Sequence, residues 1–439
     1  MSSGAGTLPP QRTGEPTAGN HNSAEGGSRV VFDLTRLLWR AEWLAPTGID
    51  RVELAYARHL IATARDRLSF VGWWGRFGLL PDNLAVALVE ALDALWSGDT
   101  LDRQLQRRTG KIAWQLRRHL FLGAGKRPLY SELRADRGPL VYLLVSHHHL
   151  HQPAVITRFK ERTGARFVIF VHDLIPIEYP EHVGWKQPER HHRRMEAVAR
   201  LADSVIVNST DTAVAFRRYF AERNSTIPVV VAPLGVDLGA TPCVVASRSD
   251  RPYFVYIARI EPRKNHRVLL EVWDRLARRL GTEAPRLVLV GRRGRKNKEI
   301  LASLRRSPLL QSLVDEHARL PDAAVARFLA GACAAVFPSL AEGFGLPVAE
   351  ALALGVPVLC SNLPALREVG REVPEYLDPG DLAGWEEAII EYARRGSPRR
   401  QGQLNRLAAW RAPSWDEHFK KLEPLINTDP PRTVRSQGA

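Results

Sequence analysis

The stretch Glu342-Gly-Phe-Gly-Leu-Pro-Val-Ala-Glu350 brings together a carboxylate, a glycine-containing loop, a helix start and a second carboxylate. The apolar residues 335–337 before it predict the end of a buried strand, and Pro338 cannot continue the hydrogen bonding of that strand. Glu342 is therefore expected to open the loop beyond the carboxyl end of a strand, which is where open α/β sheets bind their ligands.

The same stretch has the features of an anion-binding turn. Gly343 and Gly345 permit close approach of the backbone to a ligand, and Pro347 suits the first position of a short helix that ends near Leu354. The unpaired N–H groups at this helix start would face an anion. Glu350 is expected in the first turn, from which it could reach a neutral hydroxyl. The alternative is an ordinary strand-to-helix turn in which Glu350 only interacts with the helix dipole.

Elsewhere in the chain, short apolar runs alternate with helical patterns, as βαβ units with parallel sheets require. The apolar runs are 29–32, 140–145, 167–171, 204–207 and 229–232 in the first half, and 253–257, 287–290, 335–337 and 357–360 in the second half. Helices are predicted from about 49 to 64 and from 268 to 280. The sequence thus predicts an α/β protein with two Rossmann-like, doubly wound domains that face each other across a cleft.

Composition suggests where the parts of the chain begin and end. Residues 1–28 are rich in Gly, Ser, Thr, Pro and Asn, which predicts a disordered tail because such a segment cannot offset its ordering entropy. The expected division is a first domain at 29–240, a linker at 241–251, a second domain at 252–410, a terminal helix at 411–427 and a flexible tail at 428–439.

Charge and cysteine content restrict the classes of function. The 439 residues include 62 Lys and Arg and 47 Asp and Glu, and the net charge of +15 favours an anionic partner such as a nucleotide, a nucleic acid or a lipid surface. The three cysteines, Cys243, Cys333 and Cys360, are widely spaced, which argues against a disulfide framework and indicates a reducing cytosol. Without a signal pattern or a run of about 18 apolar residues, the chain is expected to be soluble or to lie on a membrane without crossing it.

These features resemble the retaining glycosyltransferases of family 4, whose two-Rossmann-domain fold is called GT-B. The resemblance covers about residues 29–427, and the E-x7-E stretch from Glu342 to Glu350 is its strongest match. The other matches are Arg259-Ile-Glu-Pro-Arg-Lys264, Val290-Gly291, Pro233-Leu-Gly-Val-Asp237 and Ser414-Trp415. The resemblance implies that the terminal helix crosses back to the first domain.

Two basic residues and one histidine are the remaining candidates for catalysis beside Glu342. Arg259 and Lys264 follow the first strand of the second domain, and a guanidinium fork with an ammonium group suits a diphosphate leaving group. A solvated basic turn is the alternative. In the family that this chain resembles, a histidine after the corresponding strand lies over the donor sugar. The resemblance implies this role for His172. Asp173 is expected to orient the ring or to cap the next segment, and a structural histidine bonded to backbone is the alternative.

The resemblance also implies the substrate-binding residues and the chemistry. In it, Glu342 contacts the donor sugar and Glu350 holds the ribose hydroxyls. The full substrate-binding set is Gly48, Asp173, Gly291, Gly343, Phe344, Gly345, Leu346 and Glu350. The implied reaction is transfer of a sugar from a nucleotide-sugar donor with retention at the anomeric carbon, in which a donor phosphate oxygen takes the acceptor proton. No metal ion and no cofactor are expected.

The run Ser146-His-His-His-Leu-His151 could suggest a metal site. Consecutive histidines in a strand point to opposite faces, and no carboxylate or cysteine spacing completes a ligand set. Acceptor contacts or entry into a helix are therefore the favoured interpretations.

Two segments look most like those of bacterial mannosyltransferases of exopolysaccharide and O-antigen assembly, namely His172 to His182 and Pro46 to Val52. This likeness implies GDP-mannose as the donor and a polyprenyl-diphosphate-linked oligosaccharide as the acceptor. A UDP-hexose donor remains open. The implied location is the cytoplasm, at the inner face of the plasma membrane.

A basic segment at 101–127 interleaves Arg and Lys with apolar residues such as Trp114 and Phe121, as helices on anionic membranes do. The alternative is a solvated helix whose apolar stripe packs on its own domain. A second basic cluster lies at 186–194. Nucleic-acid binding and a catalytically silent nucleotide-sugar sensor are the rival functions. The sequence carries no recognisable nucleic-acid motif, and the set of acidic and basic site residues argues against a silent sensor.

Overall fold

The computed structural model describes residues 27–98, 100, 102–135, 138–221, 226–237, 251–294, 297–318 and 320–427. The predicted N-terminal tail apart from residues 27 and 28, the linker apart from residue 251, and the C-terminal tail lie outside these ranges. Cys243 and Leu101 lie outside them as well.

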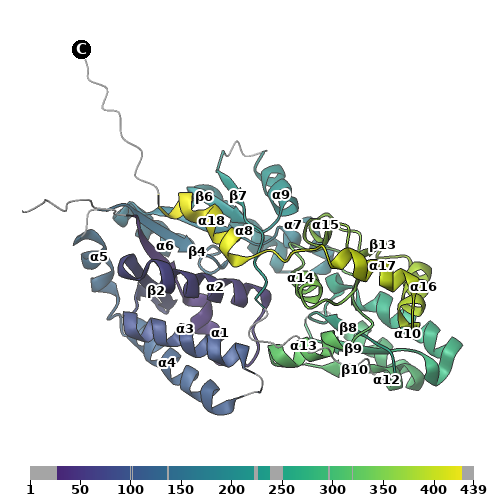
Figure 1. The fold of residues 1–439 in the computed structure, drawn as a ribbon. Coiled ribbons are helices and arrows are strands. Elements are labelled where there is room, and N and C mark those ends of the chain that lie inside the picture. The colour runs from purple at the N-terminus through teal and green to yellow at the C-terminus, as the bar shows by residue number, and fades with distance from the viewer. Residues whose placement is uncertain are drawn as a thin grey trace, which may run out of the picture.

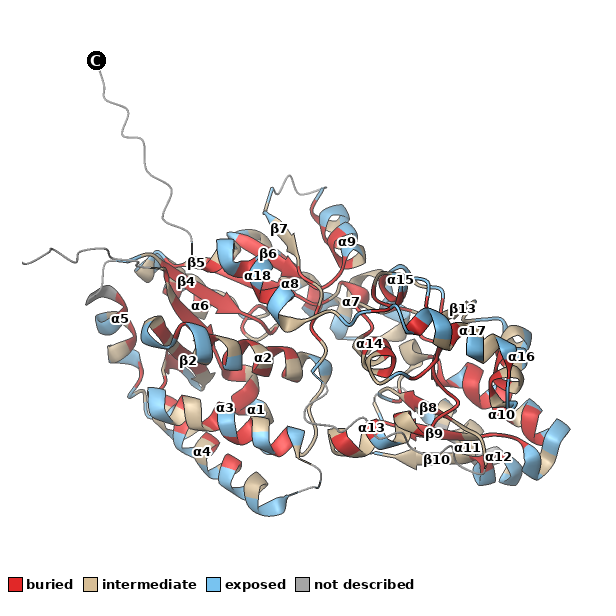
Figure 2. Ribbon diagram, in the orientation of Figure 1, coloured by how far each residue is buried: buried red, intermediate tan, exposed pale blue. Residues whose placement is uncertain are grey.

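The first domain contains a seven-stranded sheet in the order β3-β2-β1-β4-β5-β6-β7. Its strands are β1 (Arg29–Asp33), β2 (Leu68–Trp74), β3 (Arg76–Leu79), β4 (Leu140–Leu144), β5 (Arg166–Val171), β6 (Ser204–Val207) and β7 (Val229–Val231). All neighbours pair in parallel except β2 and β3, which form an antiparallel pair at the edge. Strand β4 is buried along its whole length and β5 is buried except at Arg166, because helices cover both faces of the sheet (Figure 2).

The helices of this domain include a group inserted between β3 and β4 (Figure 1). They are α1 (Thr35–Arg40), α2 (Gly48–Thr63), α3 (Asp82–Ser97), α4 (Arg103–Phe121), α5 (Lys126–Ala135), α6 (Ala154–Thr163), α7 (Ile175–Glu178), α8 (Gln187–Leu201) and α9 (Thr210–Ala221). Helix α2 begins where the sequence predicts, because Thr47 and Asp50 form a capping box at its start.

The second domain contains a six-stranded parallel sheet in the order β10-β9-β8-β11-β12-β13. Its strands are β8 (Tyr253–Ile257), β9 (Arg286–Val290), β10 (Val314–His317), β11 (Ala334–Phe337), β12 (Val358–Ser361) and β13 (Glu375–Leu377). Its helices are α10 (His266–Leu280), α11 (Lys298–Arg306), α12 (Pro308–Leu313), α13 (Asp322–Ala330), α14 (Leu346–Ala353), α15 (Pro364–Gly370), α16 (Leu382–Ala393) and α17 (Pro398–Leu407). The prediction of two doubly wound parallel-sheet domains is confirmed.

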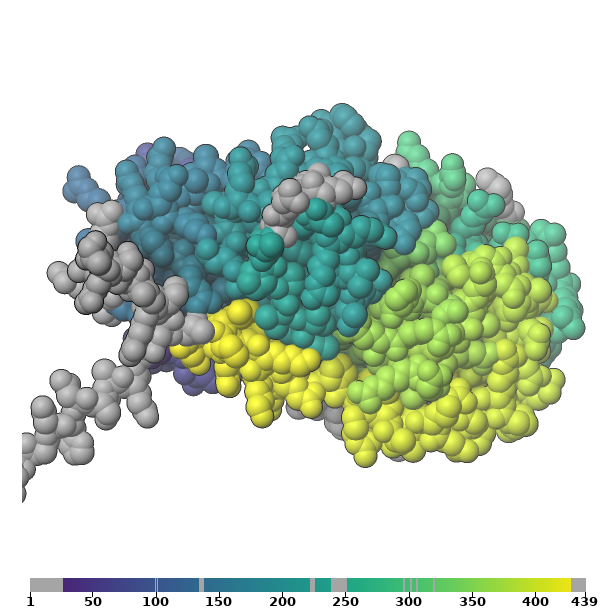
Figure 3. Space-filling view, turned by 90° about the horizontal axis from the view of Figure 1, so that it is seen from above, coloured from purple at the N-terminus to yellow at the C-terminus, as the bar shows by residue number. Residues whose placement is uncertain are grey.

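The terminal helix α18 (Trp415–Ile426) crosses back to the first domain, as the resemblance implied (Figure 3). The Ser414 hydroxyl accepts a hydrogen bond from the Glu417 N–H at 3.1 Å and caps the helix start. His418 on this helix contacts the first domain. Its Nε2 lies 2.7 Å from the Tyr56 hydroxyl, and its Nδ1 lies 2.9 Å from the carbonyl oxygen of Pro233. Among the described residues, no helix combines the length and apolarity that a membrane crossing requires.

Candidate active site

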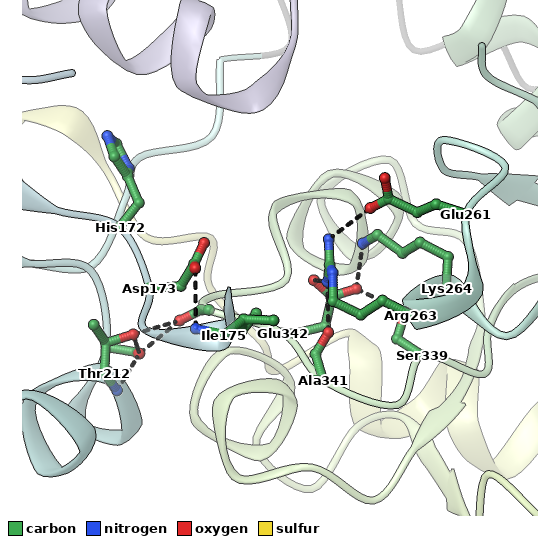
Figure 4. Close-up of polar contacts among 12 residues, drawn as sticks. His172, Asp173, Ile175, Thr212, Glu261, Arg263, Lys264, Ser339, Ala341 and Glu342 are labelled. Carbon is green, nitrogen blue, oxygen red and sulfur yellow. Dashed lines mark hydrogen bonds and ion pairs between the residues drawn. The ribbon is translucent and has the colours of Figure 1, made fainter. Parts of the chain in front are cut away.

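Glu342 lies in the loop beyond the carboxyl end of β11, as predicted, and is surrounded by hydrogen-bond donors (Figure 4). Lys264 Nζ donates to Oε1, the Ser339 hydroxyl donates to the same oxygen at 2.7 Å, and Arg263 Nη1 lies 3.2 Å from Oε2. The side chains of Glu342 and Lys264 are only 12% and 13% exposed. The carboxylate therefore has a fixed position within a mostly buried cluster.

Sheet topology explains why these side chains meet. Strands β8 and β11 are neighbours and parallel, so their carboxyl ends open at the same edge of the sheet. Lys264 ends a short 3₁₀ turn, Pro262–Lys264, which follows β8. The turn is tied to the loop after β11, because Leu340 N–H donates to the Arg263 carbonyl at 2.8 Å and Arg263 Nη1 donates to the Ala341 carbonyl at 2.5 Å.

The electrostatics of this cluster favour a charged Glu342. Burial by itself raises the pKa of the Glu342 carboxyl, but the charges of Lys264 and Arg263, with their hydrogen bonds, outweigh it and hold the pKa at about 2. Burial lowers the pKa of Lys264, which the charge of Glu342 opposes. Since the carboxylate stays ionised at any ordinary pH, it can only accept hydrogen bonds, as contact with sugar hydroxyls requires.

Arg259 does not share this cluster. The structure places Arg263, a residue that the sequence analysis did not single out, on Glu342 beside Lys264. Arg259 is exposed, and within the described ranges it forms no hydrogen bond or ion pair. Its charge is one of those that lower the pKa of Arg40, after burial and the charge of Arg36. The predicted phosphate contact of Arg259 stays a prediction, with its donors available to a ligand.

At two of the predicted glycine positions, another part of the backbone lies so close that a side chain would not fit. A Cβ atom at Gly291 would lie 1.9 Å from the carbonyl oxygen of Ala258, at a φ of 155°. A Cβ atom at Gly343 would lie 2.6 Å from the carbonyl oxygen of His172 in the first domain. Gly48, the first residue of α2, has no atom within 4 Å of such a position. Gly343 is thus the point where the second domain touches the predicted catalytic histidine.

His172 is buried at the end of β5, and its Nε2 lies 2.7 Å from the carbonyl oxygen of Val145. Burial lowers the pKa of the ring to about 4, so the neutral ring donates from Nε2 and keeps a lone pair on Nδ1. Asp173 does not orient the ring: its Oδ1 accepts from the Ile175 N–H at 3.2 Å and caps the next segment. In Figure 4 the ring lies well apart from the cluster around Glu342. The backbone bond matches the structural alternative, and contact with the donor sugar stays a prediction.

Helix α14 begins at Leu346, ahead of Pro347, with Gly345 as its N-cap at a left-handed φ of 92°. The expectation that Glu350 lies in the first turn is therefore wrong, because the earlier start moves Glu350 into the second turn. Phe344 is buried and packs in the core of the domain.

Glu350 faces the first domain rather than open solvent. Arg51 on α2 lies 3.7 Å from the Glu350 carboxylate and 2.5 Å from that of Asp322, at the start of α13. Burial raises the pKa of Glu350, and Arg51 opposes that effect. No local sequence pattern indicates this contact, because Arg51 and its partners lie about 300 residues apart and on different domains.

A second contact between the domains lies next to Gly343. The hydroxyl of Ser209, just before α9, donates to the Gly343 carbonyl at 2.6 Å. Thr210 N–H donates to Glu368 on α15 at 2.7 Å. The loop that carries Glu342 is thereby held against the carboxyl edge of the first sheet.

The histidine run lies in bends after β4 rather than in a strand, because β4 ends at Leu144. His149 adopts a φ of 67° and approaches Asp33 at 3.1 Å in the core, whereas His147 lies beside His172. In the part of the chain that the structure describes, no group of three or more His, Cys, Asp or Glu residues is arranged to hold a metal ion.

Comparison with known proteins gives this geometry a context. Residues 243–399 match the family model described as glycosyl transferases group 1. The second domain is therefore similar to group 1 glycosyltransferases over most of its length. Its matched range contains Arg259, Arg263, Lys264, Glu342 and Glu350.

Two curated relatives come from Escherichia coli. The serotype-specific mannosyltransferase WbdA is 28% identical over 269 residues, which cover 56% of this chain and 33% of the relative. The O-antigen chain mannosyltransferase B is 34% identical over 164 residues, which cover 37% of this chain and 42% of the relative. The chain thus spans about a third to two fifths of the length of these relatives.

Solved structures agree with the fold over most of the chain. Anabaena HepE in complex with UDP and glucose aligns with a TM-score of 0.59 and 15% identity, over 91% of this chain and 99% of that protein. The fold of the two domains is GT-B, as the resemblance implied.

Proposed function

We propose that this protein is a retaining glycosyltransferase that moves mannose from GDP-mannose to a polyprenyl-diphosphate-linked oligosaccharide in bacterial exopolysaccharide or O-antigen assembly. The observation that carries the proposal is the cluster in which Lys264 and Arg263 hold an ionised Glu342 at the carboxyl edge of the second sheet. The names of the Escherichia coli relatives support mannose as the sugar.

In the proposed reaction, each of these groups has one role. The donor diphosphate lies at Arg259 and Lys264, whose charges stabilise the negative charge that grows on the leaving phosphate. Glu342 accepts hydrogen bonds from the donor sugar, and Glu350 accepts them from the ribose. An oxygen of the leaving phosphate takes the proton of the acceptor hydroxyl, so the chain supplies no separate base, and neither metal nor cofactor enters the reaction.

His172 and the first domain cover the other side of the donor. The free Nδ1 lone pair of His172 can accept a hydrogen bond from a sugar hydroxyl, while the bond to Val145 fixes the ring. Contact of Ser209 with Gly343 keeps the domains together near the reacting atoms and excludes water, which protects the donor from hydrolysis.

The acceptor and its location complete the proposal. A lipid-linked acceptor places the reaction at the inner face of the plasma membrane, and helix α4 suits such a surface. Residues 103–121 contain no acidic residue, and Trp114 and Phe121 are 57% and 64% exposed. Leu116 and Leu120 on the opposite side of the helix are buried in the domain, so the helix has both an inward apolar stripe and outward apolar side chains.

The decisive experiment incubates the full chain with a panel of nucleotide sugars and an extract of the host's lipid-linked saccharides, and measures the GDP or UDP released. Release of GDP from GDP-mannose that depends on the extract supports the proposal. Release of UDP instead would favour a UDP-hexose-dependent enzyme of the same fold. Nucleotide binding without turnover of any donor would indicate a non-catalytic nucleotide-binding protein and refute the proposal.

A further inference from the structure

Two segments of the first domain bring basic side chains together beside His172. His147 and His151 follow β4, and Arg190 and Arg194 lie on α8. The ring centroids of His147 and His172 are 5.5 Å apart, and Arg190 Nη2 lies 3.4 Å from His151 Nε2. The cluster of these four side chains is called the basic cluster below.

Several nitrogen atoms of the basic cluster are buried without a hydrogen-bond partner among the described residues. They are Nε2 of His147, Nδ1 of His151 and Nε of Arg194. Arg194 is partly buried and forms no ion pair within the described ranges. Arg190 contacts a ring nitrogen of His151 rather than a carboxylate. Buried donors without partners are unfavourable, so a ligand that accepts hydrogen bonds would stabilise this arrangement.

The charges of the basic cluster indicate which charge such a ligand should carry. Burial and then the charges of Arg190 and Arg194 lower the pKa of His151 to about 4. Burial and then Arg190 lower the pKa of Arg194 to about 10. The neighbouring carboxylate is Asp173, whose Oδ1 is engaged by the Ile175 N–H. The field therefore favours an anion with several acceptor oxygens.

The position of the basic cluster indicates which substrate carries this anion. The carbonyl oxygen of His172 lies against Gly343, which adjoins Glu342, whereas the basic cluster lies beside the His172 ring on the first domain. The donor diphosphate of the proposed function lies at Lys264 in the second domain. An anion bound at Arg194, on the first domain, therefore belongs to the acceptor.

We propose that the basic cluster is a subsite for a phosphate or diphosphate group on the acceptor. This inference rests on the proposed function for the assignment to the acceptor, but the anion site itself does not depend on it. One guanidinium group can bind two phosphate oxygens at once, and the neutral histidines can donate further hydrogen bonds. The phosphate could belong to a lipid-linked saccharide or to a soluble sugar phosphate, because both present the same oxygens.

The test measures binding to the full chain by calorimetry in saturating GDP, which occupies the donor site. The probes are inorganic pyrophosphate and farnesyl diphosphate. We expect the wild type to bind pyrophosphate and Arg194→Gln to bind it at least about tenfold more weakly, since a charge-assisted hydrogen bond contributes about that much. Arg194→Lys keeps the charge and should lose less. The matched control is Arg193→Gln, because Arg193 is exposed on the same helix and pairs with Glu189 at 3.0 Å.

The outcomes separate the possibilities. Equal pyrophosphate binding by the wild type and Arg194→Gln, or an equal loss in Arg193→Gln, would overturn the subsite. Farnesyl diphosphate that binds more tightly than pyrophosphate, with the same dependence on Arg194, identifies a lipid-linked phosphate, whereas equal affinities identify a soluble one. Failure of GDP or UDP to bind would refute the proposed function while leaving the Arg194 dependence of pyrophosphate binding intact.

Discussion

Arg51 on the first domain contacts Glu350 on the second, with 3.7 Å between Nη1 and Oε1. The same guanidinium lies 2.5 Å from Asp322, so one side chain connects α2 to α14 and to the start of α13 in the other domain. If Glu350 also receives the ribose hydroxyls, the nucleotide and Arg51 compete for its oxygens or share them. The contact thus couples domain closure to the proposed nucleotide site.

Replacement of Arg51 by Ala should shift the protein towards a more open arrangement of its domains. The side chains involved are between 16% and 32% exposed, and such ion pairs contribute about 0.2–1 kcal/mol each, so we expect a few-fold change in the closed population. Small-angle X-ray scattering should detect it as a larger radius of gyration without nucleotide.

The control for this variant is Arg58→Ala on the same helix. Arg58 pairs with Asp93 and Asp237, both on the first domain, so its loss should leave the domain arrangement unchanged. Identical scattering curves for Arg51→Ala and the wild type would show that the contact does not hold the domains together.

The cluster around Glu342 predicts an asymmetry between two alanine variants. Removal of Glu342 leaves the buried Lys264 without its ion-pair partner and leaves Arg263 with Glu261, whereas removal of Lys264 leaves Glu342 with Arg263. Breaking a buried pair costs about 3–5 kcal/mol, and we expect Glu342→Ala at the upper end and Lys264→Ala below it. Urea unfolding at pH 7 measures both values, and a larger loss for Lys264→Ala would contradict this account.

Both variants should also lose most of the transfer activity under conditions in which they remain folded. Lys264→Ala removes a charge from the growing phosphate anion, and Glu342→Ala removes the acceptor of the sugar hydroxyls. Activity should be measured at urea concentrations below the unfolding midpoint of each variant. The variants are then still folded, so a loss of activity does not result from unfolding. Near-normal turnover by either folded variant would refute the assigned roles.

Much of the sheet architecture could be predicted because parallel strands are buried on both faces and appear as apolar runs. Strand β10 was missed because Val314-Asp-Glu-His317 is a polar edge strand, and β13 was missed because Glu375-Tyr-Leu377 is short and begins with a charged residue. Strand order within each sheet depends on long-range pairing, which local patterns do not encode.

The candidate site was predictable where residues adjoin strand ends, as Glu342 and Lys264 do. Arg263 was missed because its direction depends on the 3₁₀ turn at Pro262–Lys264, after which Asn265 adopts a φ of 52°. The partners of Arg51 could not be found because they depend on how the two domains are packed together.

Glu53 on α2 predicts a pH-dependent change in stability. Its carboxyl is fully buried, accepts from the Leu37 N–H at 3.2 Å through Oε1, and has no partner for Oε2 among the described residues. Burial raises the pKa of Glu53 from 4.5 to about 8, although Arg36 opposes this effect. The folded protein therefore resists an ionisation that the unfolded chain undergoes above about pH 4.5, and the wild type loses stability as pH rises towards 8.

Glu53→Gln removes this ionisation and keeps an oxygen that can accept from Leu37. Its free energy of unfolding relative to the wild type should rise between pH 4.5 and 8 by at most about 5 kcal/mol, at about 1.4 kcal/mol per pH unit, and then level off. Urea denaturation at pH 5, 6, 7, 8 and 9 checks the slope. A difference that is constant with pH would mean that Glu53 ionises normally in the folded protein.

The outward face of α4 predicts binding to anionic membranes. Trp114, Phe121 and the following Leu122 are each more than half exposed, and basic residues such as Arg118 accompany them. We expect the full chain to sediment with vesicles containing phosphatidylglycerol, and less so as salt rises, because salt screens the basic residues.

Replacement of Trp114 and Phe121 together by Ser should weaken this vesicle binding by tenfold or more, since burial of each aromatic side chain contributes about 1.5–3 kcal/mol. The control is Leu309→Ser on α12 of the second domain, where Leu309 is 50% exposed but lies away from the basic helix. Circular dichroism should show unchanged folding in both variants, because neither alters a buried side chain. The prediction is wrong if the wild type does not bind at low salt, or if the α4 variant binds equally well. Helix α4 would then be a solvated helix whose inward apolar stripe only packs on its own domain.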